Sequence, residues 1–316
     1  LYAHGTGGSF MGTIRFGLAA EVADGLGGEF AVAAATLSID EPQHGSRRGE
    51  SEREPEFLFF NFTNPRAARD NILQGAADLH SLVYFAEAFE LAAGDSPTGE
   101  AISFDPTLMT FFGHSQGATH GSLMVGFESG LLAVVLSGNG GDLVQSLLHK
   151  SEPIDIAGIL PFALLDANSE GGLSARDFHP ALAIFQAYFE RADPVNFGWR
   201  VQREPVEGVG GRHLFMTYGT GDSFSPEETQ EAYARAARLT VVLPYETEEW
   251  GLTTGDAPLS ENVTIDETPW TVGLRQYEPD AGDDGHYVST RTEQGRADVM
   301  RFLLQAMAGE VPQIGE

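Results

Sequence analysis

Short apolar runs alternate along the chain with segments whose apolar residues recur at helical spacing. Five runs predict buried strands, at 29–38, 107–112, 131–136, 212–218 and 239–243. The pattern between and after them predicts helices at 9–24, 65–94, 118–127, about 226–238 and about 290–308. Strands that alternate with helices form a mostly parallel central sheet with right-handed crossovers and helices on both faces. The expected fold class is therefore α/β.

Two of these helices have recognisable first residues. Pro65 is expected at the first position of its helix, where a missing backbone N–H costs nothing. The helix after 225 is expected to open with a capping box, in which Ser225 is the N-cap, Pro226 comes next and Glu228 is the reciprocal partner.

About seventy residues separate the strand at 131–136 from the strand at 212–218, too many for one crossover. Helical pattern recurs within this stretch at 143–148, 154–165 and 178–192. We interpret residues 143–205 as an inserted helical cap, and residues 1–142 and 206–316 as the core.

The segment 113–117 has the sequence Gly-His-Ser-Gln-Gly, which fits the pattern G-x-S-x-G. A predicted strand precedes it and a predicted helix follows it, as a strained nucleophile elbow requires. Small residues on both sides of the serine allow strand and helix to approach closely. The segment thus resembles the elbow of the α/β-hydrolase superfamily, and Ser115 is the candidate nucleophile.

A serine hydroxyl needs a histidine base, an acid that orients the base, and donors for the oxyanion. The α/β-hydrolase resemblance implies that the acid follows the serine and that the histidine comes last. Asp222 lies in a glycine-rich turn after a predicted strand, and His286 lies directly before the terminal helix. Asp142 and Asp193 are rival acids. His213, within a predicted strand, is not expected to take part.

The segment His-Gly-Thr-Gly-Gly at 4–8 resembles the oxyanion loop of the same superfamily. Two backbone N–H groups must point at the developing negative oxygen. One is expected from Gln116, the residue after the nucleophile, and the second from Thr6 in this loop.

Further segments narrow the resemblance to the bacterial virulence-factor lipase group. They are Asp-Glu-Pro-Gln-His-Gly at 40–45, Phe-Asn-Phe-Thr-Asn-Pro at 60–65, Ser-Gly-Asn-Gly-Gly at 137–141 and Ala-Asp-Pro-Val-Asn at 192–196. This resemblance implies a serine esterase or lipase that forms an acyl-enzyme on Ser115 and acts on small-molecule or lipid esters. No organic cofactor is implied.

Two other functions stay open. An amidase or peptidase would use the same Ser-Asp-His triad, because the triad does not distinguish an ester from an amide. A binding module without catalysis would have no need for all three residues. The aromatic cluster at 57–62 is expected in the core, with a wall of an acyl pocket as the alternative.

Charge excludes one large class of function. The net charge is −28, and Lys150 is the only lysine. A chain this acidic is not built to bind the phosphate backbone of nucleic acids. Such acidity suits a secreted or salt-adapted protein, or reflects an acidic, GC-rich genome. We expect an extracellular or cell-envelope location in a bacterium.

Cysteine is absent, which excludes disulfides and thiol chemistry. No stretch has the ~18–20 uninterrupted apolar residues of a membrane helix. Residues 1–5 read as the end of a strand that runs directly into the oxyanion loop. We therefore expect a second polypeptide, the N-terminal part of the same precursor, to supply upstream strands of the sheet.

Residues 166–177 follow the spacing of an EF-hand loop. Asp166, Asn168 and Glu170 stand at positions one, three and five, and Gly171 follows at the turn. The carbonyl of Gly172, the carboxylate of Asp177 and, through water, Ser174 would complete a structural Ca²⁺ site. Glu170 and Asp177 depart from the usual residues, and a polar linker between two cap helices is the alternative.

Removal of calcium tests this site. Ligand binding to the folded state alone stabilises it by about 2.7 kcal/mol when the ligand exceeds its Kd a hundredfold. EDTA should therefore lower the melting temperature of the wild type while the candidate catalytic residues stay in place. Identical melting curves with and without EDTA would contradict the calcium site.

Overall fold

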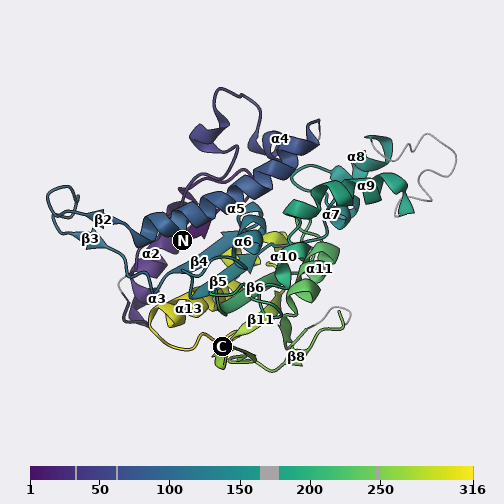
Figure 1. The fold of residues 1–316 in the computed structure, drawn as a ribbon. Helices are drawn as coiled ribbons and strands as arrows, with labels where there is room; N and C mark the ends of the chain where they lie inside the picture. The colour runs from purple at the N-terminus through teal and green to yellow at the C-terminus, as the bar shows by residue number, and fades with distance from the viewer. Residues whose placement is uncertain (33, 62, 164–177, 246–249, 316) are drawn as a thin grey trace.

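The computed structural model has a central seven-stranded sheet and describes residues 1–32, 34–61, 63–163, 178–245 and 250–315 (Figure 1). In spatial order the strands are β1 (Tyr2–Ala3), β4 (Thr110–His114), β5 (Ala133–Ser137), β6 (His213–Gly219), β11 (Val272–Tyr277), β7 (Thr240–Val242) and β8 (Thr254–Gly255). Every pairing within this sheet is parallel. The predicted α/β class, with a parallel central sheet, is confirmed.

Helices cover both faces of the sheet (Figure 1). On one face, α5 (Pro65–Glu87), α6 (Gln116–Met124) and α11 (Glu227–Ala237) pack on the apolar cluster that contains Phe111. On the other, α2 (Leu18–Ala23) and α13 (Glu293–Met307) pack on the cluster that contains Phe112. Because successive residues of a strand point to opposite faces, Phe111 and Phe112 lie in two separate apolar cores.

Between β5 and β6 lie α7 (Leu143–His149), α8 (Ile156–Ala163), α9 (Pro180–Phe189), η3 (Glu190–Ala192) and α10 (Val195–Gly198). Helices α7, α8 and α9 gather at one end of the molecule (Figure 1). They share a small apolar core of their own, made by Leu147, Leu148, Ile156, Leu160 and Leu182. These helices lie within the segment interpreted as a cap.

The remaining elements are short. They are α1 (Gly12–Arg15), α3 (Gly25–Gly28), η1 (Gly45–Arg48), α4 (Pro55–Phe59), η4 (Gly285–Tyr287), α12 (Val288–Arg291), and two hairpins formed by β2 (Glu90–Leu91) with β3 (Ile102–Ser103) and β9 (Val263–Ile265) with β10 (Thr268–Trp270). No helix in the described ranges is long and apolar enough to cross a membrane.

Two predictions for the first forty residues were wrong. The helix at 9–24 is broken into α1 and α2 at Gly17, whose φ of 77° does not fit a helix. The described residues of 29–38 form no strand, and among them Ser38 alone makes an isolated parallel bridge, to Tyr2. This alanine-rich segment has weak strand propensity, and its described residues stay exposed or half-buried.

Two further differences from the sequence-based predictions, at Ser225 and at β11, involve tertiary contacts. The capping box at 225 does not form, because the Ser225 hydroxyl donates instead to the carbonyl of Gly138 at 2.7 Å. Strand β11 was not predicted, because its sequence contains Gly273 and a charged residue, Arg275. That guanidinium is buried and donates to the Asp298 carboxylate at 2.8 Å, which offsets the cost of burying its charge.

Helices α5 and α6 pack tightly against each other at Gly75. A Cβ atom there would lie 2.2 Å from two ring atoms of His120. The His120 ring cannot easily move, because its Nδ1 is 2.7 Å from the buried carboxylate of Glu41.

Gly75→Ala should therefore lower the free energy of unfolding by about 1–3 kcal/mol, as overpacking of a core does. The matched control is Gly94→Ala, because a Cβ atom at Gly94 meets no atom within 4 Å. Urea unfolding measures both variants. Equal stability of the two would show that the helices separate at no cost.

Candidate active site

Ser115 lies at a strained turn between β4 and α6. Its φ of 56° and ψ of −117° are rare for a residue with a side chain, and such strain is typical of functional sites. The flanking glycines permit the turn. A Cβ atom at Gly113 would lie 2.7 Å from the Gly117 carbonyl oxygen, and one at Gly117 would lie 2.3 Å from the Ala3 carbonyl oxygen. The local geometry is that of a nucleophile elbow.

Asp222 and His286 lie together, although 64 positions separate them in the sequence. The Nδ1 atom of His286 is 3.0 Å from both carboxylate oxygens of Asp222, and both side chains are buried. Asp222 follows β6, and His286 lies in η4 after β11, the strand that pairs with β6. Parallel pairing thus brings the two residues to the same edge of the sheet.

The loop around Asp222 orients its carboxylate. Backbone N–H groups of Phe224 and Ser225 donate to Oδ1 at 2.9 and 2.7 Å, and the side chain of Gln230 donates to Oδ2 at 3.2 Å. Asp284 joins the two loops, since it accepts from the Ser223 hydroxyl at 2.5 Å and from the His286 backbone N–H at 2.8 Å.

His286 also lies beside the elbow. Its ring centroid is 4.9 Å from that of His114, the residue before Ser115. The ring of Phe224 stacks on its other side at 4.6 Å. A Cβ atom at Gly138 would lie 2.6 Å from the imidazole, so only glycine leaves room there. Ser115 Oγ makes no hydrogen bond to His286, although the structure describes both; such bonds often tighten only with substrate bound.

The rival acids lie elsewhere. Asp193 accepts hydrogen bonds from the backbone N–H groups of Asp142, Leu143 and Val195 at 2.9–3.1 Å. Asp142 is the N-cap of α7, where its side chain accepts from the Gln145 N–H. Both residues therefore anchor the start of α7, and Asp222 is the carboxylate in contact with His286.

The two residues expected to supply the oxyanion donors, Thr6 and Gln116, are joined through their side chains. The Thr6 hydroxyl donates to the side-chain oxygen of Gln116 at 2.9 Å. The backbone N–H groups of Thr6 and Gln116 donate to no residue that the structure describes. Gly5 packs directly on the nucleophile, since a Cβ atom there would lie 2.8 Å from the Ser115 Cβ. This arrangement leaves two N–H groups available beside Ser115.

Two buried histidines hold the oxyanion loop. His44 Nε2 accepts from the Gly7 backbone N–H at 2.9 Å, and His4 Nε2 accepts from the Glu41 N–H at 3.0 Å. Their rings contact each other edge to face at 4.8 Å. Burial lowers the pKa of His4, and it lowers the pKa of His44 to about 4, so both stay neutral acceptors. The Asp-Glu-Pro-Gln-His-Gly segment thus positions the loop at 4–8.

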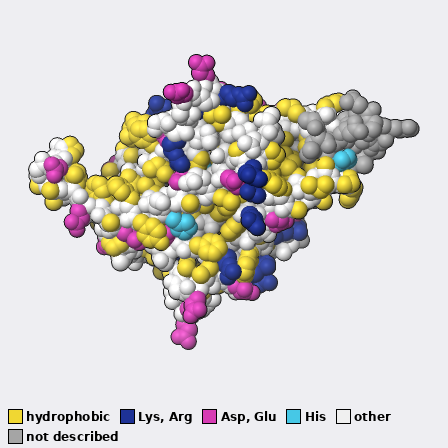
Figure 2. Space-filling model, turned by 45° about the horizontal axis from the view of Figure 1, so that its top comes forward, with side chains coloured by type: hydrophobic (Ala, Val, Ile, Leu, Met, Phe, Trp, Pro, Cys, Tyr) yellow, Lys and Arg dark blue, Asp and Glu magenta, His cyan; other side chains and the backbone are white. Residues whose placement is uncertain are grey.

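A cavity of about 370 Å³ opens beside Ser115 between α5 and the cap helices. Its walls are mainly apolar and include Phe59, Phe60, Ile72, Leu147, Leu160, Phe185, Phe189 and Phe224. Phe59 and Phe60 thus line a cavity. This position agrees with the alternative prediction for the cluster at 57–62, a wall of a pocket. Apolar side chains also cover the outside of this end of the molecule (Figure 2), where Ile159, Phe162 and Ile184 are 53%, 65% and 73% exposed.

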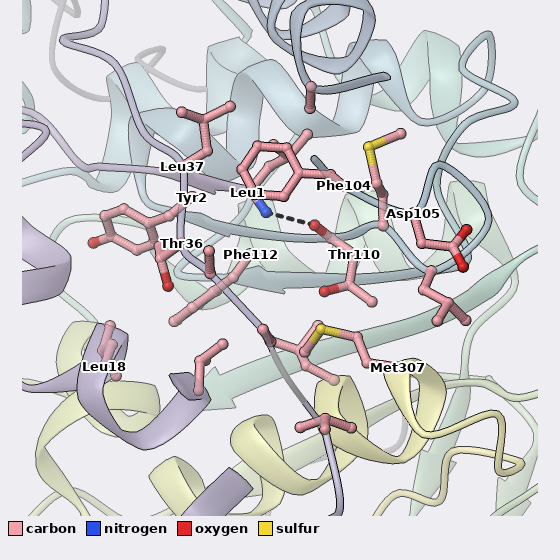
Figure 3. Close-up of a pocket in the computed structure, with 18 of the residues that line it drawn as sticks. Leu1, Tyr2, Leu18, Thr36, Leu37, Phe104, Asp105, Thr110, Phe112 and Met307 are labelled. Carbon is pink, nitrogen blue, oxygen red and sulfur yellow. Dashed lines mark hydrogen bonds between the residues drawn. The ribbon is translucent and has the colours of Figure 1, made fainter. Parts of the chain in front are cut away.

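A second cavity, of about 320 Å³, lies at the β1 edge of the sheet (Figure 3). Leu1, Leu37, Phe104 and Met307 are among its lining residues, and the Leu1 backbone amine donates to the Thr110 carbonyl at 2.7 Å. Ser115 does not line it, whereas Ser115, Thr6 and Gln116 line the first cavity. The candidate active site is therefore the cavity between α5 and helices α7, α8 and α9.

The predicted calcium ligands, Asp166, Asn168, Glu170, Gly172 and Asp177, lie outside the described residues. Within the described ranges, no group of three or more His, Asp or Glu side chains is placed to hold a metal ion. The calcium site stays a prediction from the sequence.

No role in the triad or the oxyanion loop was predicted for Lys150, Phe224, Gln230, Asp284 and His44, although His44 belongs to the segment at 40–45 that carries the resemblance. Lys150 carried a signal, as the only lysine in the chain, but its position in the cavity wall follows from tertiary packing. Phe224 and Gln230 lie within eight residues of Asp222, and Asp284 lies two residues before His286, but no local pattern indicates these contacts. His44 contacts Gly7, 37 positions away, and this contact follows from tertiary structure.

No family model matches the chain, and no curated protein matches it. Among solved structures, TT1662 from Thermus thermophilus is 16% identical, with 97% of this chain and 87% of that chain covered and a TM-score of 0.47. DcsB in complex with its substrate analogue is 15% identical, with coverage of 98% and 90% and a TM-score of 0.47. Acetyl xylan esterase 1 from Thermoanaerobacterium sp. JW/SL YS485 is 13% identical, with coverage of 87% and 64% and a TM-score of 0.44. Likeness this distant carries no argument about activity.

The neutral state of His44 predicts a pH dependence of stability. Its folded pKa of about 4 lies below its ordinary value of 6.5, so the unfolded chain takes up the proton first as the pH falls. The stability that neutral His44 contributes is therefore fully present above pH 6.5 and is lost progressively towards pH 4.

Urea unfolding between pH 7 and pH 4.5 should show this loss in the wild type. In His44→Gln, whose amide oxygen can still accept from Gly7 but does not titrate, the loss should be shallower by about 1 kcal/mol per pH unit. Equal slopes would mean that His44 titrates normally in the folded protein.

Proposed function

We propose that this protein is a serine hydrolase that cleaves carboxylic esters through an acyl-enzyme on Ser115. One observation carries the proposal. The buried Asp222–His286 pair, with Nδ1 at 3.0 Å from the carboxylate, lies at the same sheet edge as a strained, glycine-flanked serine. Strain and buried polar groups cost stability, and a chemical role explains why they occur together.

Each residue has a distinct part in the proposed reaction. His286 takes the proton of the Ser115 hydroxyl through Nε2 while Asp222 holds Nδ1–H and stabilises the imidazolium. The oxygen attacks the ester carbonyl, and the backbone N–H groups of Gln116 and Thr6 stabilise the oxyanion. His286 then protonates the leaving alcohol, and water repeats the cycle to release the acid.

The cavity supports an ester rather than a peptide as substrate. A peptide brings an N–H and a C=O group at each residue, and buried polar groups without partners are costly. The apolar walls next to Ser115 offer few partners. An amidase or peptidase is the alternative outcome of the test below. Membership of the virulence-factor lipase group, an extracellular location and a second polypeptide stay predictions from the sequence.

Ser115→Ala should lower kcat by several orders of magnitude on p-nitrophenyl esters, and His286→Ala should be nearly as severe. His213→Ala is the matched control. His213 is also a buried histidine, but it accepts a hydrogen bond from the Thr271 backbone N–H at 3.0 Å and lies at the opposite end of β6 from Asp222. It should keep wild-type kcat in the folded fraction.

The same assays should include the corresponding p-nitroanilides, on which the wild type should be much slower. A faster reaction with anilides would favour an amidase. Near wild-type hydrolysis of esters by Ser115→Ala would rule out the triad altogether.

A further inference from the structure

The only lysine of the chain lies inside the candidate active-site cavity. Lys150 follows α7 and is 7% exposed, and it lines the same cavity as Ser115 and Gln116. No aspartate or glutamate is among the described residues that line this cavity, although the chain has 46 of them. The cavity thus combines apolar walls with one cation.

The Lys150 ammonium lies in a setting that leaves donors free. It donates to the carbonyl of Phe224, and the rings of Phe60 and Phe224 lie 5.4 and 5.9 Å from Nζ. An ammonium has three N–H donors. Within the described part of the chain, Phe224 supplies the single hydrogen-bond acceptor. Two donors therefore remain in an apolar environment, where an unmet donor is costly.

The charges around Lys150 indicate what those donors would bind. Burial lowers its pKa to about 8, and the carboxylates of Asp222, Asp284 and Glu152 oppose that shift. The ammonium therefore stays largely protonated near neutral pH, with three negative charges already close to it. A carboxylate on the substrate would add a fourth negative charge and would be repelled. A neutral oxygen can accept the hydrogen bonds without that repulsion.

We propose that the cavity is an acyl subsite for esters whose chain is apolar but carries a neutral oxygen acceptor, a ketone or hydroxyl group, that binds Lys150. This inference rests on the proposed ester hydrolysis. The acyl arm is assigned to the cavity because it stays attached to Ser115 through both half-reactions, whereas the alcohol must leave after the first. Lys150 is then a specificity-determining residue.

The test compares p-nitrophenyl octanoate with the p-nitrophenyl oxo-octanoates, which differ only in the position of the ketone. Hydrogen bonds to charged groups contribute about 1.5–3 kcal/mol, so one position should raise kcat/KM by about tenfold to a hundredfold over octanoate. In Lys150→Met, which keeps the length of the side chain but has no donor, the ratio of oxo-octanoate to octanoate should fall to about one or below.

Ser146→Ala is the matched control, because Ser146 lies on α7, the helix that directly precedes Lys150, and lines the same cavity. It should retain the preferred position and the ratio. The ratio does not depend on the fraction of folded enzyme, and the wild-type series is informative even if Lys150→Met fails to fold.

The inference is overturned if no position beats octanoate, if Lys150→Met keeps the preference, or if the half-ester of a dicarboxylic acid is the preferred substrate. If a preference for a ketone or hydroxyl group is found only in acetates with varied alcohols, the cavity binds the alcohol part of the ester. That result would also overturn the inference. Labelling of Ser115 by a fluorophosphonate separates these results from failure of the proposed function. If Ser115 is labelled and octanoate is hydrolysed, the proposed function stands while the inference fails.

Discussion

The close approach of α6 to β1 is the constraint on which the rest of the site depends. Gly117 lies so near Ala3 that a Cβ atom would come within 2.3 Å of the Ala3 carbonyl oxygen, and the Gly117 N–H donates to the carbonyl of His4 at 3.1 Å. This contact forces the tight turn at Ser115 and sets the oxyanion loop beside it. Any larger residue at Gly117 would move Ser115 away from the loop at 4–8, whose expected role is to stabilise the oxyanion.

Buried polar side chains gather around this contact, and specific hydrogen bonds position several of them. Glu41 pairs with His120 on α6 at 2.7 Å, and the same loop provides His44 to hold Gly7. Asp222 accepts hydrogen bonds from two backbone N–H groups in addition to its contact with His286. The net charge of −28 is therefore carried mainly by the surface, while the carboxylates inside are paired and positioned.

The segment after α7 is tied to the loop that carries Asp222. Ser151 and Glu152, next to Lys150, donate their backbone N–H groups to the carbonyl of Ser223, in the loop that holds Asp222. Lys150 donates to the neighbouring carbonyl of Phe224, whose ring stacks on His286. The wall of the cavity and the loop of the acid are thus one connected structure, so a substrate that contacts Lys150 lies close to the catalytic candidates.

The sequence by itself determined the features that depend on local chain chemistry. Alternation of strands and helices predicted the parallel sheet, and Gly113 and Gly117 predicted the elbow, because close backbone approach needs glycine wherever it occurs. Tertiary structure alone decided the rest. Strand β11 pairs with β6 and β7 and buries Arg275 against Asp298, and the Ser225 hydroxyl donates to the Gly138 carbonyl rather than capping its own helix. The choice of Asp222 over Asp142 and Asp193, and the burial of Lys150, follow from contacts between residues distant in sequence, which no local pattern encodes.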